Sequence, residues 1–73
     1  MEKVDLHGIK HEEVMRALDS FFWEMMQRNK VEVEVITGIS DKMKSIVKDV
    51  CKDYNFKVLD HPTNIGCLIV KIN

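Results

Sequence analysis

Hydrophobic and polar residues follow two different periods along this chain. In residues 31–36 three valines alternate with two glutamates, which predicts a strand with one buried and one solvated face. In residues 10–29 the apolar positions instead recur at the spacing of one helical face. These positions are Val14, Leu18, Phe21, Phe22 and Met25. The pattern predicts a long amphipathic helix followed by a half-buried strand.

A second amphipathic helix is predicted over residues 41–54, with Ser40 as its N-cap. Its apolar face consists of Met43, Ile46, Val47, Val50, Cys51 and Tyr54. Shorter apolar runs predict a first strand around Val4 and Leu6 and two late strands over residues 56–59 and 67–72, joined by a loop. The order is strand, helix, strand, helix, strand, strand.

This order predicts an α/β (α+β) two-layer sandwich formed by residues 1–73 as a single domain. Strand–helix–strand crossovers favour parallel pairing, whereas the short last connection allows an antiparallel pair. Because one strand has a solvated face, the helices are expected to cover only one side of the sheet. We therefore expect a mixed four-stranded sheet with two helices on one face.

The composition is typical of a globular protein, with 45% hydrophobic and 32% charged residues. A formal net charge of -1 provides no long-range attraction for a polyanion, so nucleic-acid binding would depend on a local patch. No apolar run approaches the roughly 20 residues that cross a bilayer. We expect a cytoplasmic protein without membrane contact, in which Cys51 and Cys67 are buried free thiols.

Two short strings carry the candidate chemistry: VDLHG at residues 4–8 and VITGIS at residues 35–40. Each is typical of a strand end that turns into a helix, and two such turns can meet at one edge of a sheet. Asp5 and His7 bring an acid and an imidazole together, and residues two apart in a strand point to the same side. Backbone N–H groups around Gly38 and the following helix start are suited to holding a phosphate.

The same residues also have purely structural interpretations. Asp5 is suited to accepting hydrogen bonds from turn N–H groups, with His7 as an ordinary turn residue. Thr37 fits as a β-branched strand residue and Ser40 as a helix cap. Both interpretations stay open on the residues alone.

The three histidines do not form a metal motif. His7 and His11 straddle a turn and a helix start, and neither cysteine lies near them in sequence. We therefore expect no dedicated metal site and no firmly bound cofactor. A magnesium ion held partly by substrate phosphate is the alternative left open.

Three strings in order, VDLHG, TGIS and NIGCLIVKI, resemble the signatures of the small MutS-related (Smr) domain family over nearly the whole chain. The resemblance implies a two-layer fold and, in several members, nicking endonuclease activity on DNA or RNA; other members bind nucleic acid or act as accessory domains. It places Asp5 and His7 at the acidic and basic positions of the first motif. Thr37 and Gly38 begin the second motif, in which Ser40 stands where a second glycine is usual.

We therefore predict a minimal Smr-like nucleic-acid-binding domain, with nicking as its candidate activity and Asp5 and His7 as the catalytic residues. The candidate nucleic-acid contacts are Thr37, Gly38, Ser40, Lys42 and Lys44. A binding module without catalysis is one alternative. Another is a protein-interaction or homodimer module that uses a second apolar stripe on the first helix, formed by Met15, Phe22, Trp23 and Met26. That stripe is also compatible with a broad core face that half covers Trp23. The sequence does not distinguish DNA from RNA.

Overall fold

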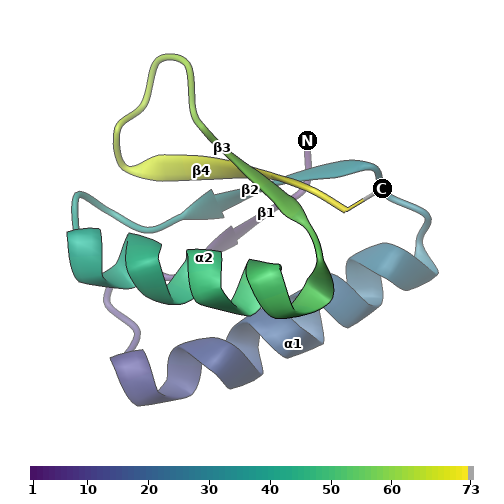
Figure 1. The fold of residues 1–73 in the computed structure, drawn as a ribbon, viewed down its shortest axis with the longest axis horizontal. Helices are drawn as coiled ribbons and strands as arrows, with labels where there is room; N and C mark the ends of the chain where they lie inside the picture. The colour runs from purple at the N-terminus through teal and green to yellow at the C-terminus, as the bar shows by residue number, and fades with distance from the viewer. Residues whose placement is uncertain (73) are drawn as a thin grey trace.

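The computed structural model describes residues 1–72 as a helical layer against a sheet (Figure 1). Its elements are β1 (Lys3–Asp5), α1 (His11–Gln27), β2 (Glu32–Ile36), α2 (Asp41–Tyr54), β3 (Lys57–Asp60) and β4 (Cys67–Lys71). The predicted element order is confirmed, and the predicted ends lie within two residues of the observed ones. Neither helix in this part of the chain has the length and apolar character needed to cross a membrane.

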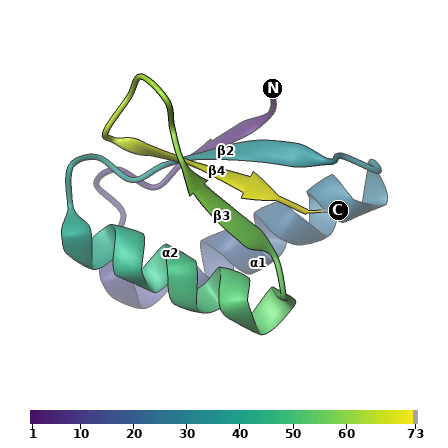
Figure 2. The same ribbon diagram turned by 45° about the horizontal axis from the view of Figure 1, so that its top comes forward.

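The sheet has the strand order β1-β2-β4-β3. β1 and β2 are parallel because α1 connects them as a crossover, whereas β4 pairs antiparallel with both β2 and β3. Both helices lie on the same side of the sheet, and β4 runs between β2 and β3 (Figure 2). The mixed four-stranded sheet with two helices on one face is confirmed.

The ends of α2 follow from its sequence. The Ser40 hydroxyl accepts a hydrogen bond from the Met43 amide at 3.1 Å, which confirms Ser40 as the N-cap. Asn55 ends the helix in the left-handed conformation, with φ of 64°. α1 begins after Lys10, which makes no side-chain cap. The start of α1 therefore has unpaired amides that water or a ligand can reach.

The core lies between the two layers. β2 and β4 each alternate, so that Val33, Val35, Leu68 and Val70 face the helices and are fully buried. The helices contribute their predicted apolar faces; the buried members are Val14, Leu18, Phe22, Met25, Met43, Val47, Val50 and Cys51. Two tightly packed aromatic contacts, from the Phe22 ring to Tyr54 and Phe56, join α1 to the end of α2 and to the segment that enters β3.

The proposed partner stripe on α1 needs correction. Phe22 has no exposed surface, because it lies four residues after Leu18 on the face that packs against the sheet. Met26 is half-buried against the same core. Met15 and Trp23 are 57% and 64% exposed, so Trp23 is also less covered than expected. The stripe is therefore interrupted, and only two of its four members face solvent.

Both cysteines are buried free thiols, as predicted. Burial raises the pKa of the Cys51 thiol to about 11. Burial also raises the pKa of the Cys67 thiol, and a hydrogen bond with Glu34 acts in the same direction. Both thiols therefore stay protonated near neutral pH and are poor nucleophiles.

Candidate nucleic-acid interface

Three loops meet at one edge of the sheet. β1 and β2 are parallel and end together, and β4 begins beside them, since Asp5 pairs with Ile36 and Ile36 with Cys67. Both helices also begin at this edge (Figure 1). We call this region, formed by residues 5–10, 37–42 and 61–66, the loop edge. It places the positive ends of two helix dipoles close to both sequence motifs.

The first and second motifs are in contact through His7 and Gly38. Gly38 adopts a left-handed conformation with φ of 71°, and a Cβ atom built there would lie 3.2 Å from His7 Cδ2. The imidazole therefore packs directly over the Gly38 main chain while His7 itself stays exposed. The φ angle favours glycine here, and a larger residue would also press on the imidazole ring.

Asp5 holds the turn that carries His7. β1 ends at Asp5, and a carboxylate oxygen of Asp5 accepts a hydrogen bond from the His7 amide at 2.9 Å. The two residues are thus linked through the turn, and the expectation that they project together from a strand is wrong because His7 lies beyond the strand. Both residues are exposed, and the bond to the amide uses one of the two carboxylate oxygens.

Thr37 and Gly38 direct their amides toward the β3–β4 loop. The Thr37 and Gly38 amides donate to the Gly66 carbonyl at 2.8 and 3.0 Å. The Thr37 hydroxyl, on a residue that is 2% exposed, donates to the Gly38 carbonyl at 2.8 Å and has the Gly66 carbonyl at 3.2 Å as a second acceptor. The expectation that the Gly38 amide holds a phosphate therefore needs correction, because that amide already has a partner.

Gly66 is a site residue that sequence reasoning missed. Its amide is held by the Asn64 side chain at 2.9 Å, and its carbonyl joins the second motif to the β3–β4 loop. The string NIGC gave a signal, since a glycine leads into β4. Its role in joining the loops depends on a contact across 29 residues, which local patterns do not reveal.

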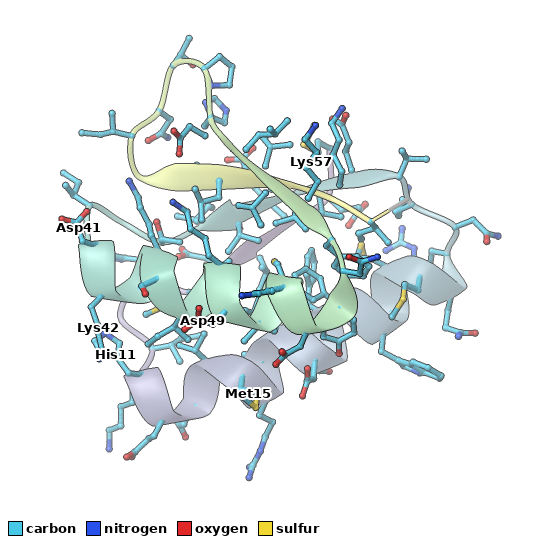
Figure 3. The ribbon with its side chains drawn as sticks, in the orientation of Figure 1. His11, Met15, Asp41, Lys42, Asp49 and Lys57 are labelled. Carbon is cyan, nitrogen blue, oxygen red and sulfur yellow. The ribbon has the colours of Figure 1, made fainter. Side chains whose placement is uncertain are left out.

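The first turn of α2 provides free amides at the loop edge, as the start of α1 does. Among residues 1–72, the Asp41 and Lys42 amides have no hydrogen-bond partner in the structure. Lys42 is exposed and extends toward His11 at the start of α1, whereas Asp41 lies on the other side of the helix end (Figure 3). The Lys44 ammonium instead binds the Ile65 carbonyl. Lys42 is thus the more available of the two predicted lysines.

The described residues do not fit a resident metal. Within residues 1–72 no three side chains of His, Cys, Asp or Glu cluster as ligands. His61 has a different role, because its Nδ1 atom accepts the amides of Thr63 and Asn64 at 3.1 and 3.0 Å. This ring shapes the β3–β4 loop by accepting these two amides.

Comparisons with a family model and with solved structures identify the family and the fold of this chain. Residues 4–71 match the family model of the Smr domain. The chain belongs to the Smr domain family. The crystal structure of the Smr domain of Thermus thermophilus MutS2 matches with a TM-score of 0.90, over 100% of this chain and 99% of that chain, at 15% sequence identity. This likeness shows the Smr fold, and no curated protein matches the sequence.

The resemblance read from the three motifs is confirmed. Smr domains generally bind nucleic acids and are known for nuclease-related activity. In this Smr domain the three motifs, which are far apart in the sequence, meet at the loop edge through the contacts His7 to Gly38 and Thr37 to Gly66.

The contacts of Thr37 predict a structural role for its hydroxyl. Thr37→Val keeps the shape and both amide bonds to Gly66 but removes the hydroxyl donor, and we expect it to lower the free energy of unfolding by ~1 kcal/mol. Urea denaturation measures this loss, with Thr37→Ser as the variant that keeps the hydroxyl. We expect the folded valine variant to bind nucleic acid normally. Unchanged stability with lost binding would instead place the hydroxyl on the ligand.

Proposed function

We propose that this Smr domain binds a phosphodiester of nucleic acid at the loop edge and hydrolyses it with Asp5 and His7. The observation that carries the proposal is the packing of the exposed His7 ring over Gly38. This contact brings a group able to transfer protons beside the segment that leads into α2. The free amides of Asp41 and Lys42 follow three and four residues after Gly38.

The phosphate would lie against the Asp41 and Lys42 amides. An anion at a helix N-terminus gains about 0.3–1 kcal/mol from the helix dipole, and the two amides supply donors that have no protein partner. The Lys42 ammonium adds a charge contact. Ser40 caps this turn and Lys44 holds the β3–β4 loop, so both support the site through the backbone. Thr37 and Gly38 shape it in the same way.

Asp5 and His7 would divide the proton transfers of hydrolysis. The second carboxylate oxygen of Asp5 accepts a proton from the attacking water, while the His7 imidazolium gives a proton to the leaving oxygen. The bond between phosphorus and the leaving oxygen breaks as the new bond to the water oxygen forms. Asp5 also fixes the backbone of His7 through the 2.9 Å bond, so its positioning and chemical roles must be tested separately.

The charge of the chain limits the expected affinity. With a formal net charge of -1, we expect binding to depend on a small number of phosphate contacts around Lys42. The logarithm of the affinity should therefore fall with the logarithm of salt concentration with a slope of only about -1 to -2, as expected for one or two phosphates.

The variant Asp5→Asn separates the two roles of Asp5. It keeps an oxygen that can accept the His7 amide but removes the charge and the base, whereas Asp5→Ala removes all three. We expect Asp5→Asn and His7→Ala to bind nucleic acid and to cleave it about 100-fold more slowly than wild type. The measurements are nicking of supercoiled plasmid and of a structured RNA, each with and without magnesium, and binding by fluorescence anisotropy.

Matched controls use residues away from the loop edge. Asp53→Asn and Lys52→Ala change similar exposed side chains in the last turn of α2 and should leave activity and binding unchanged. Lys42→Ala should weaken binding to every sequence. Cleavage that survives both Asp5→Asn and His7→Ala would remove the proposed catalytic roles. Absence of binding to any DNA or RNA at low salt would overturn the proposed function.

A protein-interaction function has weaker support. Met15 and Trp23 are exposed on α1, but the buried Phe22 and half-buried Met26 interrupt the stripe that such a partner would cover. The loop edge, by contrast, unites all three family motifs.

A further inference from the structure

Two isoleucines stand in solvent at the loop edge. Ile39 is 75% exposed and Ile65 is 70% exposed. Isolated exposed apolar residues are common and need no explanation, but these two flank one contact. Gly38 precedes Ile39 and Gly66 follows Ile65, and a Cβ atom built on Gly66 would lie 3.5 Å from the Gly38 backbone. The two loop tips are therefore adjacent.

Neither isoleucine side chain is buried in the core of the fold. Ile39 precedes the N-cap Ser40, a position from which an apolar side chain often packs against the fourth residue of the helix. In this chain that fourth residue is Lys44, whose ammonium instead binds the Ile65 carbonyl. The same bond fixes the backbone of Ile65, and the Asn64 side chain holds the next amide. Both tips are thus fixed by hydrogen bonds while their side chains remain in water.

The two isoleucines lie close to the proposed phosphate site, which indicates the kind of ligand that would cover them. Ile39 is two residues from the free Asp41 amide, so a group that covers the isoleucines would also be next to the bound phosphate. A nucleotide carries both parts, a phosphate and an apolar base face. In a continuous duplex the base faces are stacked and hidden, and an isoleucine that wedges between two steps must first unstack them at a cost of about a few kcal/mol, so contact is favoured where a base is already unstacked.

We infer that Ile39 and Ile65 form an apolar platform for an unstacked nucleobase, so that this Smr domain selects nucleic acid with an unpaired base beside the bound phosphate. This inference rests on the proposed function and names its substrate class. The held loop tips favour such a contact because little conformational freedom is lost when the base arrives. DNA and RNA both offer this chemistry.

The test compares two fluorescein-labelled hairpins that differ only in one unpaired base in the stem, each made as DNA and as RNA. We expect wild type to bind the hairpin with the unpaired base about tenfold more tightly by fluorescence anisotropy. The double variant Ile39→Ser with Ile65→Ser should lose this preference and keep its affinity for the paired hairpin. Val31→Ser is the matched control, since Val31 is 54% exposed just before β2, at the opposite end of that strand.

The outcomes separate the two proposals. Failure of wild type to bind any hairpin would overturn the proposed function. Equal binding of the two hairpins by wild type, or a preference that survives in the double variant, would overturn only the inference. Sedimentation adds a further criterion, because a wild-type dimer that dissociates in the double variant would assign the isoleucines to a contact between copies. Ile39→Met with Ile65→Met should keep the preference.

Discussion

Phe22→Ala is expected to lower the free energy of unfolding by ~3–5 kcal/mol, the range for truncating a buried phenylalanine. Phe22 has no exposed surface, and its ring centroid lies 5.4 Å from that of Tyr54 and 5.2 Å from that of Phe56, both edge to face. The truncation would remove the contact that joins α1 to α2 and to the entry of β3. A domain of 73 residues has a total stability of about 4–11 kcal/mol, so the loss is a large share of it.

Urea denaturation followed by far-ultraviolet circular dichroism measures this loss, and the neighbouring residue supplies the control. Trp23 is 64% exposed, so Trp23→Ala should change the free energy of unfolding by less than about 1 kcal/mol. A small effect of Phe22→Ala would contradict the core position of this ring. It would also make Phe22 available for a continuous apolar stripe on α1, which a protein partner would need.

The element order and helix faces could be predicted because they depend on local patterns. The bounds of α2 agree with the prediction at both ends, since Ser40 caps its first turn and Asn55 leaves the helix in a left-handed conformation. Phe22 was assigned both to the core face and to a partner stripe because it lies where the two apolar stripes of α1 meet. The strand order could not be predicted, because the place of β4 between β2 and β3 depends on pairing between distant segments.

The candidate site also has parts that local patterns predict and parts that depend on contacts between distant segments. Parallel β1 and β2 bring Asp5, His7 and Gly38 to one edge, as the two motifs predicted. The link from Thr37 to Gly66 and the bond from Lys44 to Ile65 could not be predicted, because they join α2 and its preceding turn to a loop more than 20 residues away. Ser40, which stands in the second motif where a second glycine was expected, caps α2, while Gly38 provides the close approach to His7.

Gly38→Ala is expected to damage both stability and the site. An L-residue at φ of 71° is strained by ~1–2 kcal/mol, and the free energy of unfolding should fall by about that amount. The new methyl group would also lie 3.2 Å from His7 Cδ2, so the imidazole must move by a few tenths of an ångström. A displaced ring should slow the proposed cleavage by about tenfold or more, since catalytic rates depend steeply on such placement.

Gly8→Ala separates the two effects of the Gly38 substitution. Gly8 also has a left-handed backbone, with φ of 86°, but a Cβ atom there meets nothing within 4 Å. The two variants should therefore lose similar stability in urea, while only Gly38→Ala displaces the His7 ring and slows nicking of supercoiled plasmid beyond what the stability loss explains. The Cδ2–H resonance of His7 in nuclear magnetic resonance spectra reports the displacement without relying on activity. Equal losses of activity in the two variants, with an unmoved resonance, would show that Gly38 serves only the turn and that its contact with His7 has no part in function.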